Sequence, residues 1–287
     1  MSLWLDLAGC EYRIAYVNGG GLRTRYLEAG REGRENSKEA LIFLHGSGGY
    51  LEAYTKNIPA HAKHMRVFAI DMIGHGWTDK PDHPYEPKHY VKHLLDFCDA
   101  MGLERVHLSG ESLGGWVATH FASTHPGRTG KIILNTAAGV HYDPAVSARI
   151  HEMSIKAAEN PSRENIKKRL EWLMLDPSIV TEEMVDLRYK VYTLPNFGRV
   201  MRNVMCLHTA EFRVPNLISD EECARITAPT LVIWTSHDPG STIEVGKKLA
   251  GMIRGSKFVV MDKCGHWPQF EDPDNFNRLQ LEFLGAA

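Results

Sequence analysis

The alternation of short apolar runs with longer amphipathic stretches constrains this fold most strongly. The predicted strands lie at residues 40–44, 66–70, 106–109, 131–135, 230–234 and 257–261. The predicted helices lie at residues 51–64, 85–101, 113–124, 241–252 and 273–284. Apolar runs at 12–17 and 22–28 flank Asn18-Gly19-Gly20-Gly21, which predicts an N-terminal hairpin. Strands that alternate with helices pack into a mostly parallel sheet, so the predicted fold class is α/β.

The alternation stops between residues 140 and 228, where we find only helical periodicity. The expected helices there are 150–158, 166–173, 182–191 and 199–208. An all-helical block inserted into an α/β series is most simply a lid over the carboxyl ends of the strands, where ligands bind in such sheets. We therefore expect a core of residues 1–139 and 229–287 and a helical lid, or cap domain, of residues 140–228.

Composition limits the partners of this chain. It has 287 residues, 43% of them hydrophobic, and a formal net charge of −2 at pH 7, so it offers no basic surface to a nucleic acid. No apolar run approaches the roughly 20 residues that cross a bilayer, and the first residues do not resemble a signal peptide. The five scattered cysteines are typical of free thiols. We expect a cytoplasmic protein that binds a small molecule, with no membrane partner; a homo-oligomer stays open.

A Gly-x-Ser-x-Gly motif lies between a predicted strand and a predicted helix. Gly110-Glu111-Ser112-Leu113-Gly114 follows the strand at 106–109 and opens the helix at 113–124. This is the context of a nucleophile elbow, a tight turn that exposes a serine hydroxyl beside the free N–H groups of a helix N-terminus. The alternative is a serine in an ordinary glycine-rich turn. The motif and its context predict Ser112 as a nucleophile.

An acid and a base for Ser112 follow later strands in the order that a nucleophile elbow requires. A serine hydroxyl needs a base within hydrogen-bonding reach and an acid that orients the base. Asp238 and His266 each come directly after a predicted strand. His237 is a rival base but precedes the acid, and Asp238 could instead cap the next helix. The sequence predicts Asp238 as the acid and His266 as the base, with Asp262 as the next candidate acid.

Two backbone donors are expected to stabilise the oxyanion of an acyl-transfer reaction. One is the N–H of Leu113, directly after the nucleophile. The other comes from the glycine-rich turn at 45–49, with Ser47 favoured and Gly46 second. This turn lacks the spacing and the Lys-Ser/Thr ending of a phosphate-binding loop. No histidine pair has the pattern of a zinc site, so we expect neither a metal nor a cofactor.

Four motifs, spread over nearly the whole chain, resemble the α/β-hydrolase superfamily. They are Leu44-His45-Gly46-Ser47-Gly48, Asp71-Met72-Ile73-Gly74-His75-Gly76, Gly110-Glu111-Ser112-Leu113-Gly114-Gly115 and Gly265-His266. Residues 20–30 and 264–271 are more specifically similar to the meta-cleavage product hydrolases. The resemblance implies an α/β-hydrolase fold with a helical lid. It also implies cleavage of a carbon–carbon bond in the vinylogous 1,5-diketone acids formed during aromatic ring degradation.

The same resemblance implies contacts with the substrate. Members of that family carry a lid arginine that binds the substrate's carboxylate, matched by Arg188, and a tryptophan after the catalytic histidine, matched by Trp267. A solvated lid arginine and plain core packing are the alternatives. The residue before the nucleophile is usually asparagine in that family but is Glu111 here. A carboxylate near an anionic substrate costs binding unless it is paired, and Arg188 is the candidate partner. We count all three as predicted substrate-binding residues.

Three functions stay open at this point. The main hypothesis is a serine hydrolase whose Ser112, Asp238 and His266 cleave a carbon–carbon bond in a meta-cleavage product of the 2-hydroxy-6-oxo-dienoate type. A carboxylesterase for small hydrophobic esters would share all three residues, since only the acyl pocket and the lid differ. A non-catalytic hydrolase-like receptor for a small ligand is the third hypothesis, and the intact set of three residues argues against it.

Overall fold

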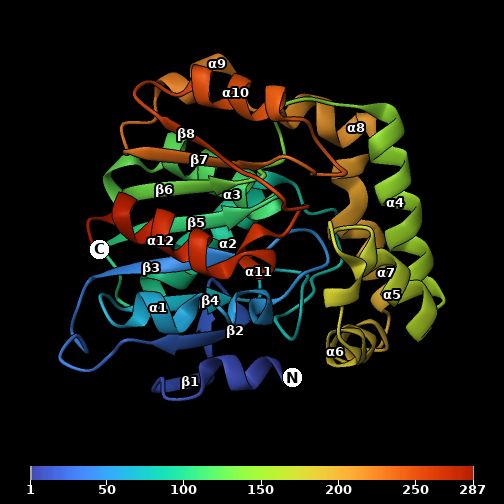
Figure 1. Cartoon of the computed structure of the whole chain (residues 1–287), viewed down its shortest axis with the longest axis horizontal. Helices are drawn as coiled ribbons and strands as arrows, with labels where there is room; N and C mark the ends of the chain where they lie inside the picture. Colours follow the sequence, from blue (N-terminus) through green and yellow to red (C-terminus); the bar gives the residue numbers. More distant parts are fainter. Residues whose placement is uncertain (1, 287) are drawn as a thin grey trace.

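An eight-stranded sheet forms the centre of the molecule (Figure 1). The structure is a computed structural model that describes residues 2–286. The strands are β1 (Tyr12–Gly19), β2 (Leu22–Ala29), β3 (Glu39–Leu44), β4 (Val67–Ile70), β5 (Arg105–Glu111), β6 (Thr129–Asn135), β7 (Thr230–Thr235) and β8 (Lys257–Met261). Their order across the sheet is β1-β2-β4-β3-β5-β6-β7-β8. The strands from β4 and β3 through to β8 run parallel, and only the pairs β1–β2 and β2–β4 are antiparallel. The predicted α/β class is confirmed.

The N-terminal hairpin is also confirmed. Its register pairs Tyr12 with Ala29 and Gly19 with Leu22, so the chain reverses through Gly20 and the residue after it. Gly20 has a φ of 56°, a left-handed conformation that glycine adopts without steric cost.

Helices cover both faces of the sheet (Figure 1). α1 and α12 lie on one face and contact each other, and α2 and α3 do the same on the other face. The helices of this part of the chain are α1 (Ile58–Ala62), α2 (Pro87–Ala100), α3 (Leu113–Thr124), α10 (Ile243–Met252), α11 (Pro268–Glu271) and α12 (Pro273–Leu284). Short 3-10 helices are η1 (Leu3–Leu7), η2 (Leu51–Tyr54) and η3 (Pro126–Arg128).

A block of helices is inserted between β6 and β7, and most of it lies beside one end of the strands (Figure 1). Its members are α4 (Pro144–Glu159), α5 (Arg163–Glu171), η4 (Pro177–Ile179), α6 (Glu182–Tyr192), α7 (Phe197–Met205), η5 (Cys206–His208), α8 (Ala210–Arg213), η6 (Val214–Asn216) and α9 (Asp220–Ala224). The two ends of the block meet, since the N–H of Ile218 donates to the carbonyl of Gly139 at 2.9 Å. α9 packs against α3 and α10. The division into core and lid at residues 140 and 228 stays a prediction.

The structure differs from the prediction at short helices. The single helix expected at 51–64 is divided into η2 and α1. Pro59 lies in the first turn of α1 and has no N–H to donate, so it cannot continue a helix from residues 51–54. The helices α8, α9 and α11 were not predicted. They have only four or five residues each, which is too short for a helical period to be recognised.

The cysteines and the lengths of the helices can be compared with the expectations from composition. All five cysteines are free, and four of them are buried. Within residues 2–286, no helix is both long and apolar enough to cross a membrane.

The turn between β5 and α3 packs so closely that it has room only for glycine at two positions. A Cβ atom on Gly110 would lie 2.2 Å from the carbonyl oxygen of Gly114. A Cβ atom on Gly114 would lie 2.1 Å from the carbonyl oxygen of Leu44 at the end of β3. These contacts set the distance between α3 and the sheet, and so they place the residues of the turn.

We predict that Gly114→Ala destabilises the fold, because the new methyl group must displace the backbone of β3. Overpacking of this kind costs about 1–3 kcal/mol, measured as the free energy of unfolding in urea. Gly127→Ala is the matched control, because its Cβ would meet nothing within 4 Å. It should leave stability unchanged or raise it by up to about 1 kcal/mol. Equal stabilities for the two variants would contradict the packing argument.

Candidate active site

Ser112 lies in a strained turn between β5 and α3. Its φ of 52° and ψ of −112° are rare for a residue with a side chain. Three backbone hydrogen bonds hold this conformation. The N–H of Ser112 donates to the carbonyl of Asn135 at 3.0 Å, and its carbonyl accepts from Trp116 at 3.1 Å and from Ala138 at 2.9 Å. A strained turn between a strand and a helix is the geometry expected of a nucleophile elbow.

His266 and Asp238 are hydrogen-bonded to each other beside Ser112. The loop after β8 carries His266, and its Nδ1 lies 2.9 Å from Oδ1 of Asp238, in the loop after β7. The Asp238 carboxylate is fully buried, and the same oxygen accepts from the N–H of Gly240 at 2.8 Å. The N–H of His266 donates to the carbonyl of Leu173 in the inserted block at 2.7 Å. The structure thus brings together the base and the acid that the sequence singles out.

The rival acid and base lie elsewhere. His237 and Asp262 are exposed. Both contact the hydroxyl of Ser236, at 2.7 Å and 2.8 Å respectively. Their side chains belong to a surface hydrogen-bond group.

Glu271 in α11 braces the loop that carries His266. Its carboxylate accepts from the N–H groups of Gly265 at 3.0 Å and Trp267 at 3.2 Å, on either side of His266. It also accepts from the N–H of Leu175 in the inserted block at 2.8 Å. The sequence reasoning missed this role, although Glu271 ends the family-like segment at 264–271.

Glu111 makes the contact that sequence reasoning did not foresee. Its side chain is 1% exposed, and Oε1 lies 3.0 Å from Nε2 of His266. Oε2 has no hydrogen-bond partner. Within residues 2–286, no hydrogen bond joins the hydroxyl of Ser112 to His266. The expected partner of Glu111 was Arg188, and the structure corrects this to His266.

The two carboxylates change the acidity of His266. Burial by itself lowers the pKa of this imidazole, but Asp238 and Glu111 raise it, to about 10. Contact with two carboxylates therefore favours the protonated form of the ring. A charged imidazole has two N–H donors, and each meets one carboxylate.

The predicted oxyanion donors lie around Ser112. Gly46, Ser47 and Leu113 all line the same cavity as Ser112. Leu113 is the first residue of α3, so its N–H has no acceptor inside the helix. The turn after β3 is held by His45. Burial lowers the pKa of His45, and its neutral Nε2 accepts from the N–H of Met72 at 3.1 Å.

The cavity lies between the loops of the sheet and the inserted helices. Among its lining residues from the core are Glu111, Trp116, Thr136, Gly139, Ser241, His266 and Trp267. Those from the inserted block include Val146, Ser147, Ile150, Arg169, Trp172, Leu207, His208 and Arg213. Within the part of the chain that the structure describes, no group of three or more His, Cys, Asp or Glu side chains could hold a metal ion.

Arg188 is buried next to the cavity and is surrounded by aromatic rings. It is 2% exposed, and its guanidinium carbon lies 5.6 Å from the ring centre of Tyr50, 5.8 Å from Tyr192 and 5.7 Å from Trp267. Its Nε and Nη2 have no hydrogen-bond partner. Among the described residues, the lining of the cavity includes Trp267 but not Arg188.

Arg169 of α5 lines the cavity, and sequence reasoning missed it. It is 6% exposed, its Nε donates to the hydroxyl of Ser154 at 3.3 Å, and its Nη1 has no partner. Burial lowers the pKa of Arg169 to about 10. In the sequence it ends the run Lys167-Lys168-Arg169, which reads as a solvated helix face. Only the packing of α5 distinguishes it from the two lysines.

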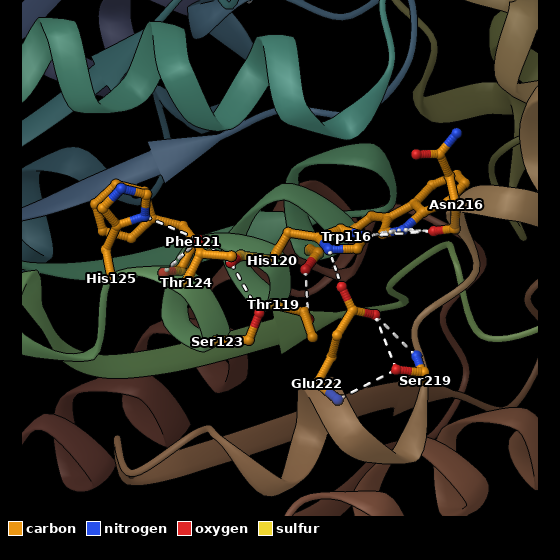
Figure 2. A network of polar contacts seen from close by, with 11 residues as sticks. Trp116, Thr119, His120, Phe121, Ser123, Thr124, His125, Asn216, Ser219 and Glu222 are labelled. Atoms are coloured by element: carbon orange, nitrogen blue, oxygen red, sulfur yellow. Dashed lines mark hydrogen bonds and ion pairs between the residues drawn. The ribbon is translucent and has the colours of Figure 1, made fainter.

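Trp116 connects the cavity wall to the inserted block (Figure 2). Its indole N–H donates to Nε2 of His120 at 2.9 Å and to the carbonyl of Asn216 at 3.1 Å. Nδ1 of His120 lies 2.9 Å from the carboxylate of Glu222, which in turn caps α9 together with Ser219. This network fixes one wall of the cavity from behind.

The profile of the alpha/beta hydrolase fold matches residues 39–273. The chain belongs to the α/β-hydrolase family. It is 30% identical over 274 residues to 2-hydroxy-6-oxo-2,4-heptadienoate hydrolase of Pseudomonas putida, covering 94% of this chain and 95% of the relative. It is 32% identical over 290 residues to 2-hydroxy-6-oxononadienedioate/2-hydroxy-6-oxononatrienedioate hydrolase of Paraburkholderia phymatum, covering 98% and 97%.

Solved structures of similar proteins have the same fold as this α/β-hydrolase. A meta-cleavage product hydrolase of Pseudomonas fluorescens superposes with a TM-score of 0.79 at 29% identity, over 94% of this chain and 97% of the other. The 2-hydroxy-6-oxo-6-phenylhexa-2,4-dienoate hydrolase of a Rhodococcus strain superposes with a TM-score of 0.84 at 23% identity, over 96% and 100%, which supports the shared fold.

In this α/β-hydrolase we predict that Asp238→Asn lowers kcat by about 10⁴-fold, the loss that the same change causes in a serine protease triad. The amide keeps the shape of the side chain but removes the charge that stabilises the imidazolium. Asp262→Asn is the control and should retain nearly full activity, because Asp262 is exposed and contacts Ser236. Hydrolysis of a nitrophenyl ester measures both. A larger loss in Asp262→Asn would reverse the assignment of the acid.

Proposed function

We propose that this hydrolase uses Ser112 as nucleophile, His266 as base and Asp238 as orienting acid to cleave a carbon–carbon bond in a 2-hydroxy-6-oxo-dienoate. The 2.9 Å contact between His266 and Asp238 and the strained turn at Ser112 support the catalytic roles. The relatives from Pseudomonas and Paraburkholderia, which align over nearly their whole length, carry the names of such hydrolases and so support the substrate class.

The residues around Ser112 suit the following sequence of steps. The dienol substrate first takes its keto form, in which C5 is a CH₂ group next to the C6 carbonyl. Ser112 then adds to C6 and passes its proton to neutral His266, while the N–H groups of Ser47 and Leu113 hold the oxyanion. When the C5–C6 bond breaks, its electron pair is delocalised to the C2 oxygen, and a proton from His266 completes the 2-hydroxydienoate. Water then releases the second acid from Ser112.

The observation that carries the substrate class is the pair of buried lid guanidiniums. Nη1 of Arg169, at the cavity, has no hydrogen-bond partner, and neither have Nε and Nη2 of Arg188, which packs against the cavity residue Trp267. A buried charge without a hydrogen-bond partner is costly. A substrate carboxylate in the cavity would give Arg169 acceptor oxygens and would add negative charge that compensates the positive charge of both guanidiniums. A neutral ester offers no such compensation.

Trp267 and the inserted helices complete the proposed site. Trp267 lines the cavity directly after the base and stacks near Arg188 at 5.7 Å, so it can hold the flat dienoate. The helices between residues 140 and 228 would act as the lid, since Arg169 and its neighbours form the cavity's far wall.

A carboxylesterase is the second candidate, and Glu111 favours it. The Glu111 carboxylate lines the cavity beside the nucleophile, where it would repel an anionic substrate but not a neutral ester. The two functions share every proposed catalytic residue. If the enzyme cleaves dienoate acids, Arg169 and Arg188 should aid the cleavage of the acid but not of a neutral ester. If it is a carboxylesterase, they should make no such difference between the two substrates.

We predict that Arg188→Gln and Arg169→Gln each lower kcat/KM for a dienoate acid by about ten- to a hundredfold. Hydrogen bonds to charged groups contribute roughly 1.5–3 kcal/mol, which corresponds to that factor. A neutral nitrophenyl ester has no carboxylate to lose, so its hydrolysis should change little. Steady-state kinetics on both substrates, for wild type and both variants, give the comparison.

Arg163→Gln is the control for these variants, because Arg163 is an exposed arginine of α5, the helix that carries Arg169, and pairs with Glu182 of α6, the helix that carries Arg188. It should behave as wild type on both substrates. Equal losses on acid and ester in Arg188→Gln and Arg169→Gln would favour the carboxylesterase instead.

A further inference from the structure

Glu111 and Ser112 compete for the same nitrogen atom. In the proposed function, Nε2 of His266 must accept the proton of the Ser112 hydroxyl. In the structure, that nitrogen lies 3.0 Å from the Glu111 carboxylate, and Nδ1 is already engaged by Asp238. A nitrogen that donates its proton to a carboxylate cannot accept a proton from a hydroxyl. The free protein therefore holds the base in a form that cannot activate the serine.

The position of Glu111 is fixed by the elbow itself. It is the last residue of β5 and directly precedes Ser112, so the strained turn that orients the nucleophile also orients the carboxylate. Gly46 packs against the end of the Glu111 side chain, because a Cβ atom on Gly46 would lie 2.5 Å from Oε2 of Glu111. The turn at residues 45–49 thus leaves just enough space for this side chain.

We propose that Glu111 is a positioning residue that holds His266 as a doubly paired imidazolium in the free enzyme, so that Ser112 is activated only after this proton is lost. The proposal rests on the proposed roles of Ser112 and His266, but not on which bond the enzyme cleaves. The proton on Nε2 leaves to water, the neutral nitrogen then faces Ser112, and the hydroxyl can pass its proton to it.

The charges around the pair support this arrangement. Asp238, from the loop after β7, and Glu111, from β5, are the two charged groups in contact with the imidazole, and together they raise the pKa of His266 to about 10 against the effect of burial. From neighbouring elements, His45, Tyr54, Arg169 and Arg188 lie close enough for the charge of Glu111 to act on their pKa values. Burial lowers the pKa of His45 and raises that of Tyr54, so both are neutral near pH 7.

The two guanidiniums do not replace His266 as the partner. No salt bridge within residues 2–286 joins Glu111 to Arg169 or Arg188, so the ion pair of Glu111 there is with the imidazole. A carboxylate this deeply buried needs a charged partner. Removing the charge of Glu111 should therefore release Nε2 for Ser112.

The test is the pH dependence of covalent labelling of Ser112 by a fluorophosphonate. Labelling requires only the nucleophile and a neutral base, so it does not depend on the natural substrate. In Glu111→Gln, the acidic limb of the labelling rate should move to lower pH by about one unit or more, and labelling at pH 7 should be about tenfold faster. A purely structural role for Glu111 would lower the rate at every pH without moving the limb.

Asp143→Asn is the matched control. Asp143 is another carboxylate at the same cavity, but it caps α4 through the N–H groups of Ala145 and Val146, a role that asparagine also fills. The limb should stay at its wild-type pH in this variant. An equal shift in Asp143→Asn would overturn the proposal, because it would assign the effect to the overall charge of the cavity.

An NMR titration of His266 in the wild-type protein and in Glu111→Gln tests the same point without labelling. In the wild-type protein both ring nitrogens should stay protonated well above pH 7, and the pKa of the ring should be lower in Glu111→Gln. A ring that is neutral at pH 7, or an unshifted limb in Glu111→Gln, overturns the proposal. If Ser112 is not labelled at any pH in either protein, the nucleophile assignment fails, and the titration alone still decides the claim about Glu111.

Discussion

Ser112 occupies a backbone conformation that costs on the order of 1–3 kcal/mol, and the surrounding structure must supply that free energy. Hydrogen bonds from Trp116 and Ala138 and the close approach of Gly110 and Gly114 hold the turn. The consequence reaches both neighbours in the chain. The residue before Ser112 points its carboxylate at the base, and the residue after it presents a free N–H at the start of α3. One strained turn therefore positions the proposed nucleophile, a proposed oxyanion donor and the carboxylate that contacts His266.

Charge is concentrated where the cavity is most buried. Two carboxylates contact His266, Arg169 lines the same cavity, and Arg188 packs against Trp267; neither guanidinium has all its nitrogens hydrogen-bonded. An anionic substrate would be attracted by Arg169 and Arg188 and repelled by Glu111. The pairing of Glu111 with the imidazolium offsets part of that repulsion, since the carboxylate and the cation form a nearly neutral unit. The same pairing makes the base dependent on pH.

Much of the core is predictable from sequence because buried parallel strands are short apolar runs that end in turn residues. The positions of Ser112, Asp238 and His266 at the ends of strands are predictable too, since chain order limits the choice, while their catalytic roles stay a prediction. The cavity arginine is not, because Lys167-Lys168-Arg169 has the composition of an exposed helix face. The partner of Glu111 is not predictable either. Whether its carboxylate turns to Arg188 or to His266 depends on side-chain positions around a strained turn.

The most direct measurement is the product analysis of 2-hydroxy-6-oxohepta-2,4-dienoate, the substrate type named for the Pseudomonas putida relative, after incubation with the purified enzyme in isotopically labelled water. Carbon–carbon hydrolysis through Ser112 predicts equal amounts of 2-hydroxypenta-2,4-dienoate and acetate, with the water-derived oxygen in the acetate carboxyl group, and no products from Ser112→Ala. Rapid hydrolysis of nitrophenyl esters together with no cleavage of any dienoate acid would contradict the account.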